Sequence, residues 1–253
     1  MGEIFLWALA LLLGACFAYI LFLTVAALLV DKNREYTQDS PFYRHLLYGA
    51  TACAIRLLHI RIGVWGMEKL PQNGRFLLVC NHRSNFDPIL TWQILRKYNL
   101  AFVSKPENFR IPIFGRFIRR CCFLAIDREN PKNALVTIQK AAALLENDEV
   151  NVAIYPEGTR SKDCVLLPFH NGVFKIAQRA NVPIVVAAIQ GTEQIHKNWY
   201  RGRTRVQFEI LETIPPEFVA ENRTAAIGAR VREDLTAGLT EKGETYAKLS
   251  DFV

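Results

Sequence analysis

The stretch RFLLVCNHRSNFDPILTWQILRKY, residues 75–98, contains the unit from which the fold is expected to be built. Its first six residues, RFLLVC, form a short apolar run of the kind that makes a buried strand. Pro88 stands where proline is favoured in the first turn of a helix, so a helix is predicted from Pro88 to Tyr98. The stretch therefore predicts a strand, a loop and a helix in succession.

The same alternation continues along the chain on both sides of this stretch. Six further apolar runs predict strands, at 62–66, 101–104, 122–126, 151–155, 183–189 and 205–211. Helical patterns lie among them, at 131–147, 170–180 and about 222–246. Strands that alternate with helices predict an α/β fold, with a mainly parallel mixed sheet flanked by helices.

The loop NHRSNFD, residues 81–87, carries the first candidate chemistry, because ligands of such sheets bind beyond the carboxyl ends of the strands. Asp87 is a candidate N-cap of the helix that Pro88 opens. The loop can also fold His82 back so that one ring N–H donates to Asp87. The other ring nitrogen could then accept a proton from a hydroxyl. A helix cap that merely contains a histidine is the alternative interpretation.

The loop YPEGTRS, residues 155–161, follows another predicted strand. Gly158 permits a tight backbone, Thr159 offers a hydroxyl, and Arg160 offers a planar fork of donors that suits phosphate. Glu157 could hold Arg160 or a substrate hydroxyl. Taken alone, the loop could equally be an ordinary turn with a surface salt bridge.

Composition limits the classes of function. Charged residues make up 22% of the chain and hydrophobic residues 51%, which excludes both a disordered chain and a many-span membrane protein. The net charge of +7 suits an anionic partner such as a membrane surface, a phosphorylated substrate or nucleic acid. No signature of a nucleic-acid-recognition fold is present, so nucleic acid is not expected as a partner. The six cysteines include no CxxC pair, and no metal site is expected.

Residues 4–30 form an uncharged apolar run that is long enough for a helix to cross a bilayer. Lys32, Arg34 and Arg44 follow the run, whereas only Glu3 precedes it. The positive-inside rule therefore predicts anchoring in the cell membrane, with the rest of the chain on the cytoplasmic side.

Residues 41–61 mix apolar and basic side chains, which predicts an amphipathic helix. It lies at the membrane interface, returns into one leaflet of the membrane, or packs as an ordinary surface helix on the domain. We accordingly divide the chain into membrane-anchoring helices, residues 1–61, and a domain on the cytoplasmic face, residues 62–253. Residues 104–128 interleave basic and apolar side chains. This mixture suits contact with an anionic lipid, although a solvated basic face above a core stripe would have the same pattern.

Four motifs occur in a fixed order: NHRSNFD, a GRFI…IDR region that ends at Arg128, YPEGTRS and VPIVVAAI. Their combination, over roughly residues 62–215, resembles the glycerolipid acyltransferases, and most closely the bacterial 1-acyl-sn-glycerol-3-phosphate acyltransferases. Two departures are visible. Tyr155 stands where phenylalanine is usual, and VPIVVAAI lacks a second proline that is often present in that motif.

The resemblance implies roles for individual residues. His82 would act as general base on the acceptor hydroxyl, oriented by Asp87, and the oxygen would attack an acyl thioester without an acyl-enzyme. The resemblance also implies that the phosphate region of the acceptor is bound by Glu157, Gly158, Thr159 and Arg160. Arg128, at the end of the second motif, and Lys105, upstream of it, match further substrate-binding positions. Main-chain N–H groups of the loop 82–88 are the candidate oxyanion donors.

The implied reaction moves a fatty acyl group from acyl-CoA or acyl-carrier protein to the sn-2 hydroxyl of lysophosphatidic acid. It yields phosphatidic acid for phospholipid biosynthesis and needs no cofactor. The expected partners are the lipid bilayer and these two substrates. Two alternatives remain open: an acyltransferase for another acceptor, such as glycerol 3-phosphate or another lysophospholipid, and a non-catalytic module that binds anionic lipid.

Overall fold

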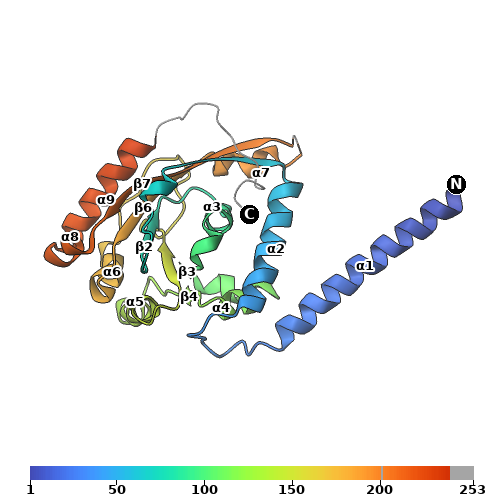
Figure 1. Ribbon diagram of the computed structural model, residues 1–253, viewed down its shortest axis with the longest axis horizontal. Coiled ribbons are helices and arrows are strands. Elements are labelled where there is room, and N and C mark those ends of the chain that lie inside the picture. The colour runs from blue at the N-terminus through green and yellow to red at the C-terminus, as the bar shows by residue number, and fades with distance from the viewer. Residues whose placement is uncertain (201, 240–253) are drawn as a thin grey trace.

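The computed structural model describes residues 1–200 and 202–239, and its centre is a seven-stranded sheet (Figure 1). The strand order is β1-β7-β6-β2-β5-β3-β4. Among the strands of residues 1–200 and 202–239, only β6 and β7 pair antiparallel, so the predicted α/β class with a mainly parallel mixed sheet is confirmed. All seven predicted strands are present: β1 (Ile60–Trp65), β2 (Leu77–Cys80), β3 (Leu100–Ser104), β4 (Leu124–Ala125), β5 (Asn151–Ile154), β6 (Ile184–Gln190) and β7 (Thr204–Ile214).

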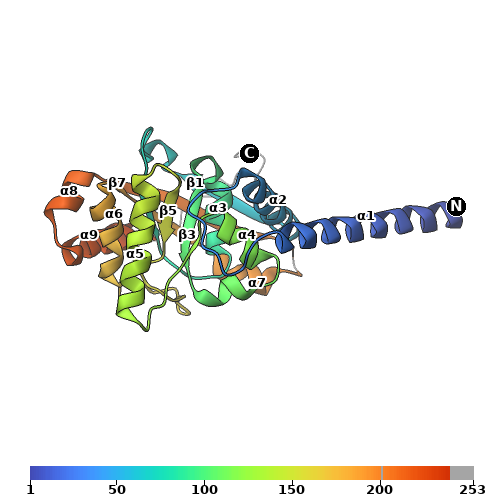
Figure 2. The same cartoon turned by 90° about the horizontal axis from the view of Figure 1, so that it is seen from below.

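Helices cover both faces of the sheet, as Figures 1 and 2 show. One face carries α2 (Pro41–Leu57), α3 (Asp87–Ile94) and α4 (Phe114–Arg120). The other face carries α5 (Pro131–Glu146), α6 (Lys175–Ala180), α8 (Pro216–Glu221) and α9 (Thr224–Gly238). A short helix, α7 (Ile195–Asn198), follows β6. The helix predicted at 88–98 divides into α3 and a 3-10 turn at Arg96–Tyr98, and the part of the last predicted helix beyond residue 239 lies outside the described residues.

Strand β2 explains why the central strands are apolar on both sides. Leu77 and Val79 pack into the core beneath α5, α6 and α9, whereas Leu78 and Cys80 pack into the core beneath α2, α3 and α4. Successive side chains of a strand point to opposite faces, so a strand between two helical layers must be apolar at every position. Burial also raises the pKa of the Cys80 thiol well above its ordinary value, which makes it an inert core residue.

The apolar N-terminal run forms α1 (Gly2–Leu28), which extends away from the domain in both views (Figures 1 and 2). By length and composition this helix could cross a membrane. Its side chains are uncovered except near its end, where Ala26 and Ala27 are buried against the domain.

Helix α2 packs on the domain, and the position of residues 41–61 relative to the membrane stays a prediction. Tyr43, Leu47 and Ile55 on α2 are buried in the core. Arg44 is only 2% exposed, pairs through two nitrogens with Asp39 at 2.7 Å each, and lies over the ring of Trp92. Arg44 therefore does not contribute a charge at the membrane surface, although the positive-inside prediction counted it among the basic residues that follow the apolar run. The division of the chain at residue 61 stays a prediction.

Candidate active site

The site lies where the carboxyl ends of five parallel strands, β2 to β6, meet at one edge of the sheet. The loop after β2 supplies His82, the loop after β3 supplies Lys105, and the loop after β4 supplies Arg128. The loop after β5 contains YPEGTRS, and Thr192 follows β6. Strand order thus brings together loops that are far apart in the sequence.

The His82 and Asp87 side chains form the predicted pair. Nδ1 of His82 lies 2.7 Å from Oδ2 of Asp87. The same oxygen accepts the main-chain N–H groups of Arg83, at 2.6 Å, and Ser84, at 2.7 Å, while Oδ1 accepts the hydroxyl of Thr192. The Asp87 side chain is 0% exposed and the His82 side chain 17% exposed. Four donors therefore hold the carboxylate in place, and the carboxylate holds the imidazole.

The prediction that Asp87 caps α3 is wrong. Asp87 is already the first residue of α3, and Phe86 occupies the N-cap position without a side-chain hydrogen bond. The carboxylate points backward, because the loop turns tightly enough to present the N–H groups of Arg83 and Ser84 to it. Its hydrogen bonds organise the loop that carries His82, and they leave the first turn of α3 without a side-chain cap.

Aromatic rings support the imidazole from one side. The rings of His82 and Tyr155 stack at 4.4 Å and 22° between planes, and Tyr155 in turn stacks on Phe102 at 6.1 Å and 13°. Burial raises the pKa of the Tyr155 hydroxyl well above its ordinary value, so Tyr155 stays neutral and acts as a flat support. With Nδ1 bound to Asp87, Nε2 is the nitrogen of His82 that remains available.

Glu157 ties the loops after β2 and β5 together. Its Oε1 accepts the main-chain N–H of His82 at 2.7 Å, and its Oε2 accepts that of Leu167 at 2.9 Å. The N–H of Ser161 donates to the carbonyl of His82 at 2.8 Å in the same junction. Glu157 is 3% exposed, and burial raises the pKa of its carboxyl group. Both oxygens are engaged away from Arg160, so the geometry favours a positioning role for Glu157.

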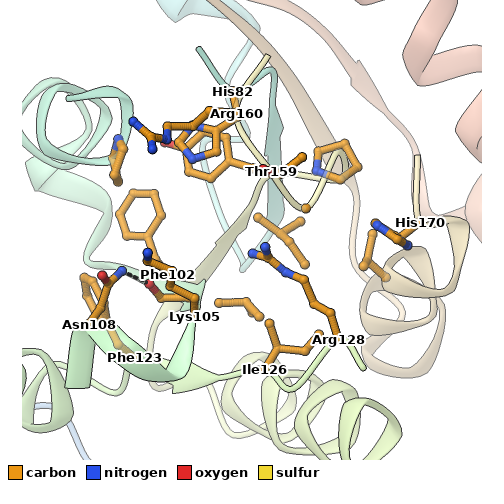
Figure 3. Close-up of a pocket in the computed structure, with 18 of the residues that line it drawn as sticks. His82, Phe102, Lys105, Asn108, Phe123, Ile126, Arg128, Thr159, Arg160 and His170 are labelled. Atoms are coloured by element: carbon orange, nitrogen blue, oxygen red, sulfur yellow. Dashed lines mark hydrogen bonds between the residues drawn. The ribbon is translucent and has the colours of Figure 1, made fainter. Parts of the chain in front are cut away.

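A cavity of about 680 Å³ opens beside His82. Figure 3 shows the Arg128 side chain extending from its loop toward the middle of this cavity. The apolar part of its wall comes from residues on both faces of the sheet. It includes Leu47, Ile89, Trp92, Phe102, Phe114, Phe123, Ile126 and Ile138. Six of the predicted site residues line this cavity: His82, Lys105, Arg128, Gly158, Thr159 and Arg160. The other two, Asp87 and Glu157, lie behind its wall.

His170, from the segment after the YPEGTRS loop, also lines the cavity. The main-chain N–H of His170 donates to the carbonyl of Pro156 at 2.9 Å. This hydrogen bond folds the chain at His170 back onto the YPEGTRS loop. Gly158 has a φ of +69°, and a Cβ added there would lie 2.8 Å from Cδ2 of His170 and 3.6 Å from Cδ of Arg128. Glycine is therefore favoured here, because another residue would be strained at this φ and would press on the His170 ring. No sequence spacing signals this contact.

Most of the N–H groups expected to stabilise the oxyanion already have acceptors within the protein. In the loop 82–88 the N–H groups of His82, Arg83, Ser84, Phe86 and Asp87 already donate within the protein, and Pro88 has none. Only the N–H of Asn85 is left uncommitted in that loop. Thr159 and Arg160 line the cavity, and their main-chain N–H groups have no acceptor within the described part of the chain.

A family model described as Acyltransferase matches residues 61–190. The chain belongs to the acyltransferase family. The match includes the loops that carry His82 and YPEGTRS, and it ends where β6 ends.

Individual proteins similar to this acyltransferase carry names from the same family. A Bacillus subtilis 1-acyl-sn-glycerol-3-phosphate acyltransferase is 30% identical over 63% of this chain and 79% of its own length. A Caenorhabditis elegans protein named putative 1-acyl-sn-glycerol-3-phosphate acyltransferase acl-2 is 26% identical over 70% of this chain and 64% of its own length. A coconut 1-acyl-sn-glycerol-3-phosphate acyltransferase is 34% identical over 53% of this chain and 42% of its own. The chain thus spans less than two thirds of the nematode and coconut relatives.

A solved structure is similar as well. The crystal structure of the 1-acyl-sn-glycerophosphate (LPA) acyltransferase PlsC from Thermotoga maritima matches with a TM-score of 0.64 and 25% identity. The match covers 77% of each chain. The resemblance drawn from the four motifs is confirmed at the level of family and fold. The roles of the individual residues of this acyltransferase stay predictions.

Proposed function

We propose that the chain transfers a fatty acyl group from an acyl thioester to the sn-2 hydroxyl of 1-acylglycerol 3-phosphate, which yields phosphatidic acid. One observation carries the proposal: the His82–Asp87 pair opens onto a cavity that combines apolar walls with the cationic residues Lys105, Arg128 and Arg160. Such a cavity suits a substrate with a hydrocarbon chain at one end and a phosphate at the other. The names of the relatives support the same acceptor.

His82 is the proposed general base. Its Nε2 accepts the proton of the acceptor hydroxyl as the oxygen attacks the thioester carbonyl, and Asp87 stabilises the imidazolium that forms. When the tetrahedral intermediate collapses, the carbon–sulfur bond breaks and the imidazolium returns the proton to the thiolate. The hydroxyl thus loses one proton and the thiol gains it. The N–H groups of Thr159 and Arg160 are available to stabilise the oxyanion.

The phosphate of the acceptor is proposed to lie among the cationic side chains of the cavity. Arg128 and Lys105 approach from the loops after β4 and β3, and Arg160 from the loop after β5. Guanidinium groups offer paired donors that match phosphate oxygens. A fixed phosphate orients the attacking hydroxyl toward His82 and lowers the entropic barrier to reaction.

Helix α1 is proposed to anchor the enzyme in the cell membrane, with the catalytic domain on the cytoplasmic side. Its apolar surface, uncovered by the rest of the described chain, supports insertion, and Lys32 and Arg34 just beyond its end support the orientation. An anchored domain meets its lipid acceptor at the bilayer surface. The proposed donor is acyl-CoA or acyl-carrier protein, and the reaction needs no cofactor.

Turnover by the full-length protein in membranes tests the proposal. The wild type should convert labelled lysophosphatidate to phosphatidate with acyl-CoA or acyl-carrier protein, and His82→Ala should lower kcat by at least about a hundredfold. His196→Ala, which changes an exposed histidine on α7, is the matched control and should keep activity. Glycerol 3-phosphate and lysophosphatidylcholine complete the acceptor panel. Preference for either one, or full activity of His82→Ala, would overturn the corresponding part of the proposal.

A further inference from the structure

A second concave surface lies at the foot of α1. It is a groove of about 570 Å³ between the end of α1 and the segment 109–119, which includes most of α4. Figures 1 and 2 both place α4 beside this end of α1. The polar lining is cationic, and none of the described residues that line the groove is acidic; the cations are Lys32, Arg110, Arg116 and Arg119. A positively charged groove favours an anionic ligand.

Two of these arginines build the groove. Nη1 of Arg116 donates to the carbonyl oxygens of Val30 at 2.8 Å and Ala27 at 3.2 Å, so it satisfies carbonyl groups at the end of α1 and fixes the helix to the domain. The guanidinium of Arg119 lies 5.0 Å over the ring of Phe109, and its Nε is buried with no acceptor in the described part of the chain. The described part of the chain leaves this donor free for a polar group from outside the protein.

The backbone between the groove and the reaction cavity is strained. Ile113 has φ 61° and ψ −65°, and the N–H of Phe114 donates to the carbonyl of Pro112 at 2.6 Å, which is a γ-turn. A β-branched residue at positive φ costs energy that the surrounding structure must offset, and such strain gathers at functional sites. Ile111, two residues earlier, lines both the groove and the reaction cavity. The strained turn therefore lies where the two concave surfaces meet.

We propose that this groove binds the headgroup of an anionic glycerophospholipid of the bilayer, at the boundary between the membrane and the reaction cavity. The inference rests on the proposed function, because it takes α1 to be inserted. The last turn of α1 then lies at the depth of the headgroups, where Lys32 and Arg110 are exposed to the lipid surface. Apolar residues of the groove, Leu28 and Pro112 among them, contact the start of the acyl chains. The site is separate from the cationic residues near His82.

Photolabelling of the full-length protein in phosphatidylcholine vesicles tests this site without relying on turnover. Two probes carry the same diazirine acyl chain, one on phosphatidate and one on phosphatidylcholine. The phosphatidate probe should label residues 24–33 preferentially, since these residues line the groove but not the reaction cavity, where phosphatidate is the proposed product. Lys32→Ala/Arg110→Ala, which removes two exposed cations, should lower that preference by roughly ten- to thirtyfold. Lys175→Ala/Arg179→Ala, on exposed positions of α6 at the opposite side of the domain, should retain it.

Three results would overturn the proposal. Equal labelling by the two probes would mean that the groove does not select an anionic headgroup. Loss of preference in the α6 variant as well would mean that net charge alone is responsible. Displacement of the phosphatidate probe by millimolar glycerol 3-phosphate would mean that the groove takes a free phosphate ester. Acyl transfer assayed on the same vesicles separates each of these outcomes from failure of the proposed function.

Discussion

Glu157→Gln offers the sharpest test of how the site is held together. The substitution keeps the shape of the side chain but replaces one acceptor oxygen by an NH2 group, so either the N–H of His82 or that of Leu167 loses its partner. A hydrogen bond to a charged group contributes about 1.5–3 kcal/mol. Burial raises the pKa of Glu157, so removal of the charge recovers part of that loss. We expect a net destabilisation of about 2 kcal/mol, or a Tm lower by about 4–8 °C.

The kinetic consequence follows from the position of the lost bond. Because Glu157 holds the backbone of His82, its loss should displace the general base and lower kcat by about 10- to 100-fold. The KM for lysophosphatidate should stay within about twofold of the wild-type value, since the cationic side chains of the cavity are unchanged. Asp163→Asn, an exposed carboxylate in the same segment, is the control and should change neither Tm nor kcat.

Initial rates over a range of lysophosphatidate concentrations, together with thermal unfolding of the same samples, test the predicted changes in kcat, KM and Tm. A raised KM with an unchanged kcat and Tm would refute the reasoning. That pattern would show that Glu157 contacts the acceptor directly and does not serve mainly to position His82.

Three further predictions concern other parts of the molecule. Gly158→Ala and Gly74→Ala both place alanine at a positive φ, and each should lose about 1 kcal/mol of stability. Only Gly158→Ala presses on His170, so only this variant should raise the KM for the acceptor several-fold. Burial and the Glu212 carboxylate raise the pKa of Asp234 to about 6, so folding stability should fall as pH rises from about 4 to 6. Asp234→Asn should abolish that fall and gain about 1 kcal/mol at pH 8 in thermal unfolding, after allowance for solvent screening. Thr192→Val removes the hydroxyl donor to the buried carboxylate that orients the site histidine, and chemical denaturation should report a loss of about 1–3 kcal/mol.

The fold class was predictable because it depends on local patterns. Apolar runs such as 75–80 and 183–189 predict strands at any position in a chain, and all seven predicted strands exist. Strand order was not predictable from these patterns. The pairing of β2 with both β5 and β6, and the antiparallel placement of β7, depend on contacts between segments far apart in the sequence.

The site was predictable in part. The His82–Asp87 contact spans five residues and lies within one loop, so it could be inferred from the sequence. The contact of Glu157 with the His82 backbone spans 75 residues, and that of Thr192 with Asp87 spans 105. No local pattern encodes such pairs, so the sequence placed Glu157 among the phosphate ligands and gave no signal for Thr192.

By itself the sequence determined the strand and helix content, the apolar N-terminal helix and the chemical groups of the two loops, because each depends on residue type and near spacing. The tertiary structure decided which of these groups face the cavity. It placed Asp87 and Glu157 behind the wall as buried acceptors of main-chain N–H groups, and it brought His170 to the wall beside Gly158. A buried carboxylate must find donors, and which donors lie within reach is set by the order of the strands.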